Sequence, residues 1–282
     1  MAELGFYDGK IIDINQPVVT LEDRGHQFGD GVYEVVVTYN GKYYALTEHL
    51  ERFERSCAEL SIVPSYSRQE IIDICHRLLD KAQFPEAMVY LQWTRGASPR
   101  AHAFPLNTKA SFSATIRPKK SPSADFFERG VKLVAVPDER WLRCDIKSLN
   151  LLGSVLAKQK AVGAGCFEAL LVRENKFVTE GSSSNSFAVK DGVIYTAPRG
   201  NYILAGITRA IVISLAAKLG LEVREEFVTP EFYAQADEVF LTGTTTEVMP
   251  VIMIDEKQIG NGQVGPLTKK LLKAFRDTIV AK

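Results

Sequence analysis

Apolar and polar residues alternate along the first part of the chain in a way that predicts short strands. β-Branched and aromatic residues dominate these segments, and turn residues such as Asn40-Gly41 separate them. The segments are residues 4–14, 32–39, 42–46, 87–95 and 110–117. Apolar residues at helical spacing predict two helices between them, one capped by Thr47 and one opening with the capping box Ser67-x-x-Glu70. This pattern is typical of an α+β layer.

A polar, proline-containing stretch at residues 119–125 follows, and we interpret it as an interdomain linker. Short strands are predicted beyond it at residues 131–136, 167–173, 177–179, 186–190, 193–196, 223–228, 238–241 and 248–254. Helices are predicted at about 151–162, from Thr208 to Gly220, and at 265–280. The fold class is therefore α+β, with an N-terminal domain at residues 1–118 and a larger, strand-rich C-terminal domain at residues 126–282.

Composition narrows the class of protein. The 282 residues are 46% hydrophobic and 24% charged, which is ordinary for a globular enzyme. The 34 basic residues equal the 34 acidic ones, so no overall charge favours nucleic acid or an anionic membrane. No apolar run is long enough to span a membrane, and the N-terminus lacks a secretion signal. The four cysteines are far apart, so we expect a cytoplasmic protein without disulfides or bound metal.

One lysine, Lys147, lies in a largely apolar run at residues 141–152. Apolar surroundings disfavour an ammonium group and lower its pKa, and a neutral amine can form a Schiff base with a carbonyl compound. The ordinary alternative is a lysine whose charged end reaches water. Taken alone, the run favours that alternative, so the other motifs must decide.

Three hydroxyl-rich or glycine-rich motifs could hold an anionic ligand with a cationic ring. In residues 179–185, Glu180 could face a ring nitrogen while the neighbouring serines and turn amides bind an anion. Gly206-Ile207-Thr208 before an apolar helix, and residues 242–246 after a strand, could bind a phosphate through N–H and hydroxyl groups. Each motif also fits an ordinary loop, helix cap or turn.

Three further side chains could bind a carboxylate or a phosphate. Arg100 and His102 are two residues apart on a proline-braced loop, so both could contact one carboxylate. Arg52 borders the apolar face of its helix and could reach inward to a phosphate, although a surface ion pair is more usual. With Lys147 and Glu180, these groups match the parts of a pyridoxal 5′-phosphate site.

The chain resembles the fold-type IV pyridoxal-phosphate enzymes, the class of the branched-chain and D-amino-acid aminotransferases and of aminodeoxychorismate lyase. The resemblance runs essentially end to end and is carried by residues 22–34, 95–102, 141–152, 179–185 and 206–209. The segments around Lys147 and Glu180 mark the superfamily, and the Arg100/His102 loop points to the D-amino-acid branch. The resemblance implies a smaller N-terminal domain and a larger, barrel-like C-terminal one.

The resemblance also implies roles. Lys147 would hold the cofactor as a Schiff base and move the substrate proton, and Glu180 would keep the pyridine nitrogen protonated. The other implied cofactor-binding residues are Arg52, Ser183, Ser184, Leu204, Ile207, Thr208 and Thr244. Tyr33, Arg100 and His102 would bind the substrate α-carboxylate, the latter two across the interface of a homodimer.

The implied reaction is a ping-pong transfer of the amino group of a D-amino acid, such as D-alanine, to a 2-oxo acid, such as 2-oxoglutarate. The residues at 198–205 and the Gly243 turn depart from the family pattern, which leaves the side-chain preference open. The alternatives are an L-branched-chain aminotransferase, an aminodeoxychorismate lyase, and a phosphate-ligand binding protein without catalysis. An intact Lys147 argues against the last of these, because a binding protein has no need of a Schiff base.

Overall fold

A computed structural model describes residues 1–174 and 176–280. Within it the chain forms two compact units. Unit 1 contains residues 1–120 together with the short segment Ile146–Asn150, and unit 2 contains residues 121–145 and the chain from residue 151 onward. Lys147 therefore packs with the N-terminal part of the chain, although the sequence predicted it within the C-terminal domain. The expected domain limits at residues 118 and 126 stay a prediction.

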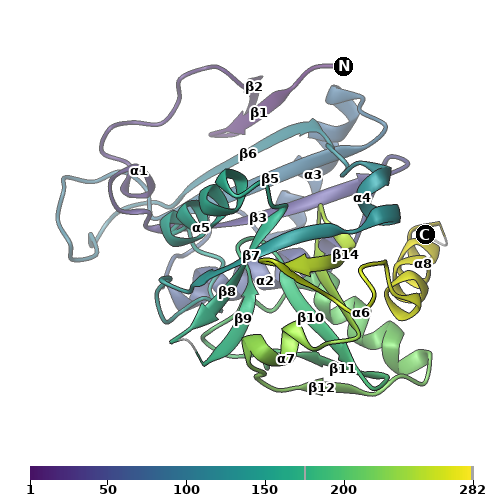
Figure 1. Cartoon of the computed structure of the whole chain (residues 1–282). Helices are drawn as coiled ribbons and strands as arrows, with labels where there is room; N and C mark the ends of the chain where they lie inside the picture. The colour runs from purple at the N-terminus through teal and green to yellow at the C-terminus, as the bar shows by residue number, and fades with distance from the viewer. Residues whose placement is uncertain (175, 281–282) are drawn as a thin grey trace. The chain divides into compact units, whose positions relative to one another are not determined.

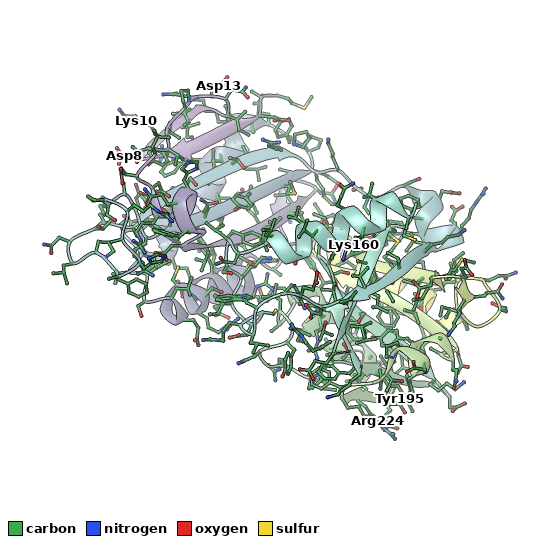
Figure 2. All side chains as sticks on the ribbon, turned by 60° about the vertical axis from the view of Figure 1, so that its left-hand side comes forward. Asp8, Lys10, Asp13, Lys160, Tyr195 and Arg224 are labelled. Carbon is green, nitrogen blue, oxygen red and sulfur yellow. The ribbon has the colours of Figure 1, made fainter. Side chains whose placement is uncertain are left out.

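Unit 1 is built on a six-stranded antiparallel sheet with strand order β2-β1-β6-β5-β3-β4 (Figure 1). Its strands are β1 (Leu4–Tyr7), β2 (Lys10–Asp13), β3 (Gly31–Tyr39), β4 (Lys42–Tyr43), β5 (Ala87–Thr94) and β6 (Ser111–Pro118). The charged side chains Asp8, Lys10 and Asp13 lie exposed on the edge hairpin (Figure 2). Charges on an edge strand discourage pairing with another chain.

The helices of unit 1 are α1 (Arg24–Phe28), α2 (Leu46–Glu59) and α3 (Arg68–Ala82). The capping box predicted at Ser67 is confirmed at the start of α3. The cap predicted at Thr47 is wrong, because α2 begins after Ala45, which has a positive φ of 54° and makes no side-chain cap. No helix was predicted among residues 22–31, but they contain α1, which Asp23 caps.

Unit 2 is built on a nine-stranded mixed sheet with the order β12-β11-β10-β13-β14-β7-β8-β9, and β15 pairs with β14. Its strands are β7 (Val131–Pro137), β8 (Glu168–Arg173), β9 (Phe177–Gly181), β10 (Asn185–Lys190), β11 (Val193–Thr196), β12 (Val223–Glu225), β13 (Glu238–Gly243), β14 (Glu247–Ile254) and β15 (Lys257–Gln258). The strand predicted at 223–228 is shorter than expected, and on this edge Arg224 donates to the hydroxyl of Tyr195 (Figure 2). The buried strands β8, β9, β10 and β13 carry polar residues of the candidate site, namely Glu168, Glu180, Asn185 and Thr242.

In the described part of the chain, five helices accompany this sheet: α4 (Ala124–Arg129), α5 (Leu152–Gly163), α6 (Ile207–Lys218), α7 (Pro230–Ala234) and α8 (Pro266–Val280). Helix α4 begins inside the stretch interpreted as a linker, because Ser123 caps it and accepts a hydrogen bond from the N–H of Asp125. Helices α5, α6 and α8 each start one residue from the predicted position, and Thr229 caps α7 in front of Pro230. Within the described residues, no helix is long and apolar enough to cross a membrane.

Candidate active site

The lysine segment is held in unit 1 by backbone hydrogen bonds to the start of β3. The N–H of Tyr33 donates to the carbonyl of Lys147 at 3.0 Å. The N–H of Leu149 donates to the carbonyl of Gly31 at 3.0 Å. On its other side, the N–H of Lys147 donates to the hydroxyl of Ser56 on α2 at 3.3 Å. Two neighbouring elements therefore fix the backbone at Lys147.

The side chain of Lys147 has aromatic and acidic neighbours as well as apolar ones. Its Nζ atom lies 4.0 Å from the centre of the Tyr33 ring, a cation–π contact, and Ile146 beside it is buried. The Tyr33 ring stacks in turn on Tyr90, with 5.5 Å between ring centres. The positive charge of Lys147 is also one of the causes that lower the pKa of Glu34. The apolar surroundings predicted from the sequence are therefore only part of the environment.

Glu34 on β3 is the centre of a buried cluster of charged side chains. Arg52 donates to both of its carboxylate oxygens, at 2.7 and 3.0 Å from Nη2, and His49 Nδ1 forms a hydrogen bond with Oε2. Burial by itself would raise the pKa of Glu34, but Arg52, His49 and Lys147 together lower it below its ordinary value. Arg52 is buried, although a surface ion pair is more usual at such a position, and its guanidinium is bound to the Glu34 carboxylate. Its binding of a phosphate stays a prediction. The sequence analysis missed Glu34 and His49.

The loop that carries Arg100 and His102 is anchored by Arg24 from α1. Arg24 Nη1 donates to the carbonyl of Ala101 at 2.6 Å, and Nη2 donates to the carbonyl of His102 at 3.4 Å. The guanidinium of Arg100 lies 4.3 Å from the centre of the Phe28 ring, and the ring centre of His102 is 5.5 Å from it. Both side chains are exposed. The structure therefore brings Arg100 and His102 together around one aromatic ring, that of Phe28. Their binding of one carboxylate stays a prediction.

In unit 2, Glu180 is buried at the end of β9 and accepts hydrogen bonds from three partners. Arg140 donates to Oε1 at 2.5 Å, and Asn185 donates to Oε2 at 2.9 Å. The backbone N–H of Leu204 donates to both oxygens at 3.2 Å. Burial raises the pKa of Glu180 to about 7, although Arg140 and the Leu204 N–H act in the opposite direction. Glu180 is therefore a carboxyl group that an additional positive charge nearby would readily ionise.

Arg140 is held in place by a second buried acid, Asp138. Two nitrogens of Arg140 donate to Asp138, each at 2.9 Å, and the Thr179 hydroxyl donates to the same carboxylate at 2.8 Å. Burial opposes ionisation of Asp138, but these donors and the charge of Arg173 lower its pKa. The sequence analysis missed Arg140 and Asp138. Their only local signal is an Asp-Glu-Arg run directly after a strand, which is also typical of an exposed loop.

The predicted serine cluster binds a buried carboxyl group, which the sequence analysis also missed. The N–H of Ser183 donates to Glu168 Oε1 at 2.6 Å, and the hydroxyls of Ser183 and Ser184 donate to it at 3.2 and 3.0 Å. Glu168 is 1% exposed, and burial raises its pKa despite these donors. A Cβ on Gly181 would lie 2.5 Å from Glu168 Oε1, which explains the glycine. Ser183 and Ser184 therefore hold the turn after Glu180 in place.

Asn185 connects this turn to two other predicted motifs. It lies opposite Thr242 in the β10–β13 pairing, and its side chain donates to the carbonyl of Leu204 at 2.8 Å. A Cβ on Gly206 would approach Asn185 Oδ1 to 2.1 Å, so only glycine fits at the start of α6. The turn after Glu180, the Leu204 loop and the end of β13 are thus neighbours within unit 2.

The phosphate-binding motifs predicted from the sequence lie in this same neighbourhood. Ile207 and Thr208 form the first turn of α6, where free backbone N–H groups and the helix dipole favour an anion. Thr244 is half-buried in the turn between β13 and β14. Among the described residues, the hydroxyls of Ser182 and Thr242 are buried without a hydrogen-bond partner. Buried hydroxyls are normally hydrogen-bonded, so both are available to donate to a polar ligand.

Comparison with known proteins identifies the family. A family model described as amino-transferase class IV matches residues 31–254, which is well over half of the chain. The chain belongs to the class IV aminotransferases. These enzymes, which have fold type IV, use pyridoxal 5′-phosphate, so the expected cofactor and fold class are confirmed.

Individual relatives agree with this assignment. The aminotransferase is 45% identical to a protein named D-alanine aminotransferase from Staphylococcus haemolyticus, over 98% of each chain. A solved branched-chain amino acid aminotransferase from Escherichia coli is 27% identical, with a TM-score of 0.92 over 99% of this chain and 95% of the other. A branched-chain aminotransferase from the thermophilic archaeon Thermoproteus uzoniensis, solved with norvaline, is 27% identical, with a TM-score of 0.88 over 99% and 95%.

The residues of this class IV aminotransferase fit pyridoxal 5′-phosphate. Glu180, a buried acid held by Arg140, suits a cationic ring nitrogen, and the start of α6 suits a phosphate dianion. The unpartnered hydroxyls of Ser182 and Thr242 offer further donors. In unit 1, Lys147 supplies an amine on a fixed backbone.

Proposed function

We propose that this aminotransferase moves the amino group of a D-amino acid, such as D-alanine, to a 2-oxo acid, such as 2-oxoglutarate. The observation that carries the proposal is the identity of 44–45% over nearly the whole chain to proteins named D-alanine aminotransferase. The similar branched-chain enzymes share the fold at 27% identity, so they support the fold more than the substrate. The products would be pyruvate and D-glutamate.

Lys147 and Glu180 would carry the chemistry at the cofactor. Pyridoxal 5′-phosphate, when bound, supplies an electron sink for the electrons released as the substrate Cα–H bond breaks. Lys147 would bind the cofactor covalently and, once released by the substrate, take the proton from Cα. Glu180 would hold a proton on the ring nitrogen, and Arg140 would keep the Glu180 carboxylate in position.

The other predicted site residues take binding roles in this proposal. Thr208, Ile207 and Thr244 would bind the phosphate, with Leu204 and the Ser183–Ser184 turn supporting the ring side of the site. Arg52, whose guanidinium forms an ion pair with Glu34, would contribute its positive charge to phosphate binding. This division of roles follows the resemblance, and the hydrogen bonds within each unit support it.

Arg100, His102 and Tyr33 would bind the substrate α-carboxylate. Arg100 supplies a permanent charge, and the loop anchored by Arg24 limits where that charge can go. Fixing the carboxylate leaves one Cα–H bond perpendicular to the cofactor ring. The position of the carboxylate-binding residues therefore selects one enantiomer.

A homodimer is part of the proposal, with Arg100 and His102 contributed to the partner's site. Helix α5 supports an interface, because Leu152, Val155, Leu156 and Val162 are 51–72% exposed along it. Contiguous exposed apolar residues of this kind mark interaction surfaces. The proposed location is the cytoplasm, and the limits at residues 118 and 126 are the proposed domain boundaries.

The test is a half-reaction on the cofactor-loaded enzyme. D-Alanine should bleach the visible absorbance of the bound cofactor, and L-alanine should leave it unchanged. Equal bleaching by L-leucine would overturn the D assignment and favour a branched-chain enzyme. The half-reaction with D-alanine releases at most one pyruvate per bound cofactor, so repeated release of pyruvate without an amino acceptor would favour a lyase. If borohydride treatment leaves no pyridoxyl adduct on Lys147, the result would favour the alternative of a phosphate-ligand binding protein without catalysis.

A further inference from the structure

The aromatic ring of Phe28, the last residue of α1, lies among three side chains that can carry a positive charge. The guanidinium carbon of Arg100 lies 4.3 Å from the ring centre, and that of Arg24 lies 4.8 Å from it. The imidazole ring of His102 is 5.5 Å away, centre to centre. The faces of an aromatic ring are electron-rich and attract a cation within about 6 Å of the centre. Phe28 is therefore a contact that Arg100 and His102 share within unit 1.

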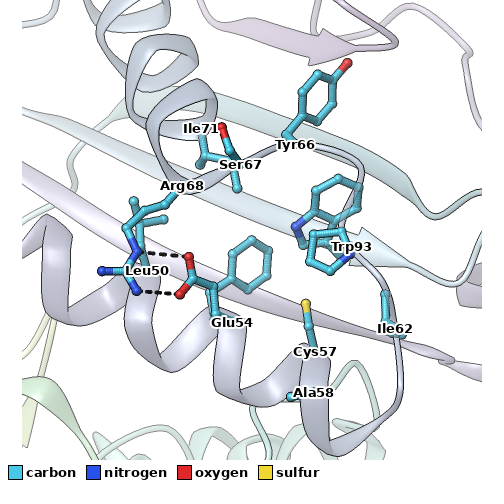
Figure 3. A pocket seen from close by; sticks show the side chains of 12 residues that line it. Leu50, Glu54, Cys57, Ala58, Ile62, Tyr66, Ser67, Arg68, Ile71 and Trp93 are labelled. Carbon is cyan, nitrogen blue, oxygen red and sulfur yellow. Dashed lines mark hydrogen bonds and ion pairs between the residues drawn. The ribbon is translucent and has the colours of Figure 1, made fainter.

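Arg100 is held differently from an arginine such as Arg68. Arg68 donates to both oxygens of Glu54, at 2.9 Å from Nε and 2.5 Å from Nη2 (Figure 3). Among the described residues, the side chain of Arg100 makes no hydrogen bond or ion pair, and its guanidinium lies over the Phe28 ring instead. An arginine paired with a carboxylate of the protein has fewer donors for a second carboxylate, whereas an arginine on a ring keeps all of its N–H donors. The ring therefore places the charge of Arg100 and leaves it available to a ligand.

The backbone around Phe28 is fixed at both ends of its short helix. At the start of α1, the side chain of Asp23 accepts a hydrogen bond from the N–H of Gly25 at 2.8 Å. At the end, Gly29 adopts a positive φ of 67°, and its carbonyl accepts from the side chain of Asn150 at 3.2 Å. Asn150 belongs to the lysine segment of unit 1, so the ring has a fixed place relative to that segment.

Buried arginines fix the backbone of the loop that carries Arg100. Arg24 donates to the carbonyl of Ala101 at 2.6 Å, and Arg24 and Arg95 both donate to Asp30 at 2.8 Å. With the backbone held beside Arg100, the remaining freedom lies in the rotamers of its long side chain. Ordering such a side chain before the ligand arrives lowers the entropic cost of binding. A ring that holds the Arg100 side chain should therefore strengthen ligand binding to it.

We propose that Phe28 is a positioning residue of the substrate site. Its ring holds the guanidinium of Arg100 where this group binds the substrate α-carboxylate, and it leaves the N–H donors of Arg100 free to do so. Phe28 acts through Arg100 and not on the substrate itself. This role of Phe28 rests on the proposed role of Arg100 in carboxylate binding.

Steady-state kinetics with D-alanine test the role of the ring. Phe28→Leu keeps an apolar side chain but removes the aromatic face, so KM should rise roughly 3- to 10-fold with a smaller change in kcat. Phe28→Tyr keeps the face and should restore KM to within about 2-fold of the wild-type value. An unchanged KM in Phe28→Leu would overturn the proposal.

Phe104→Leu is the matched control. It removes a ring whose centre lies 3.6 Å from the guanidinium carbon of Arg95. Arg95 keeps its hydrogen bonds to both oxygens of Asp30, so KM should stay within about 2-fold of the wild-type value. A rise in Phe104→Leu equal to that in Phe28→Leu would contradict a specific role of Phe28.

A double-mutant cycle separates positioning from packing. In the Arg100→Ala background no guanidinium remains to be placed, so Phe28→Leu should change KM by less than about 2-fold. The same fold-change in both backgrounds would show that Phe28 acts on the fold or directly on the substrate, and the proposal would be wrong.

Fluorinated phenylalanines at position 28 test the electrostatic nature of the contact. Fluorine withdraws electrons from the ring face with little change of shape. The logarithm of KM should therefore rise stepwise from 4-fluoro- to 3,5-difluoro- to 3,4,5-trifluorophenylalanine, each introduced by nonsense suppression. A KM that stays constant along this series would overturn the contact between ring face and guanidinium as the cause.

Ligand binding without turnover separates the role of Phe28 from that of Arg100. Propionate has the carboxylate of D-alanine without the amino group, and D-alaninol has the amino group without the carboxylate; the absorbance of the bound cofactor follows the titration of each. Phe28→Leu should weaken propionate binding roughly 3- to 10-fold and leave D-alaninol binding within about 2-fold. If Arg100→Ala weakens propionate binding and Phe28→Leu does not, Phe28 loses its proposed role and Arg100 keeps its own. If Arg100→Ala leaves propionate binding unchanged, both residues lose their proposed roles.

Discussion

Replacing Glu180 by glutamine should remove a pH dependence of stability from the cofactor-free protein. The pKa of Glu180 is raised by burial from 4.5 to about 7. A carboxyl group with a raised pKa favours the folded state at low pH, and this contribution is lost as the pH rises from about 4.5 through about 7. The amide of Glu180→Gln has the same shape and can still accept from Arg140, but it does not titrate.

The size of the pKa shift of Glu180 gives the expected change in the free energy of unfolding. A difference of about 2.5 pKa units corresponds to roughly 3 kcal/mol at 1.36 kcal/mol per unit. Relative to Glu180→Gln, the wild type should therefore lose about 3 kcal/mol of unfolding free energy between about pH 4.5 and about pH 8. Contributions from groups that do not interact with Glu180, such as Glu34 in unit 1, cancel because both proteins contain them.

Urea unfolding of both proteins across this pH range measures the difference directly. The cofactor-loaded pair is the control: a positive ring nitrogen opposite Glu180 would lower its pKa and flatten the dependence. A difference between the cofactor-free proteins that stays constant over the whole range would refute the reasoning, because it would mean that Glu180 titrates in the same range whether the protein is folded or unfolded.

Four further substitutions test the site. Lys147→Ala should lower turnover by several orders of magnitude while circular dichroism shows the fold retained; turnover near the wild-type rate would contradict its role. Arg100→Ala should raise KM for α-carboxylate substrates roughly 10- to 100-fold with a smaller change in kcat, as measured by steady-state kinetics. Arg24→Met should raise the same KM less, because it releases the loop that carries Arg100 without removing the Arg100 charge. Glu34→Gln should cost roughly 3–5 kcal/mol in urea unfolding, since it breaks a buried ion pair, and a cost below about 1 kcal/mol would contradict that.

The parts of the fold that local chemistry determines could be predicted from the sequence. The turn at Asn40-Gly41 joins β3 to β4, because these residues adopt the positive φ angles that a tight hairpin needs. Ser67 and Glu70 satisfy each other's backbone N–H groups, so the start of α3 could be predicted from these four residues of sequence. Such signals depend on neighbours in sequence.

Features set by contacts distant in sequence could not be predicted in this way. Ala45 takes a positive φ before α2, which its residue type does not favour. Helix α1 is short, and Arg24 within it binds carbonyls 77 or more residues away. The segment around Lys147 pairs with β3, more than 110 residues earlier, so its place in unit 1 is not encoded by the residues beside it.

The candidate site was predicted unevenly for the same reason. Lys147, Glu180 and Thr208 lie in motifs whose residue types suggest their chemistry. Arg140 and Glu168 do not, because a single charged residue in or after a strand is usually solvated. Only the fold shows that these two are buried and hydrogen-bonded to the motif that holds Glu180.

Three buried glutamates of the site differ in what surrounds them, and the difference separates their roles. Glu34 already faces Arg52 and His49, and its pKa is lowered, so a further cation would gain little from it. Glu168 accepts three donors from the serine turn at a single oxygen and acts to hold that turn. Glu180 has one arginine and a pKa near 7, so it is the acid that gains most from a positive ring nitrogen. The surroundings of these acids, more than their residue type, favour Glu180 as the proposed partner of the cofactor.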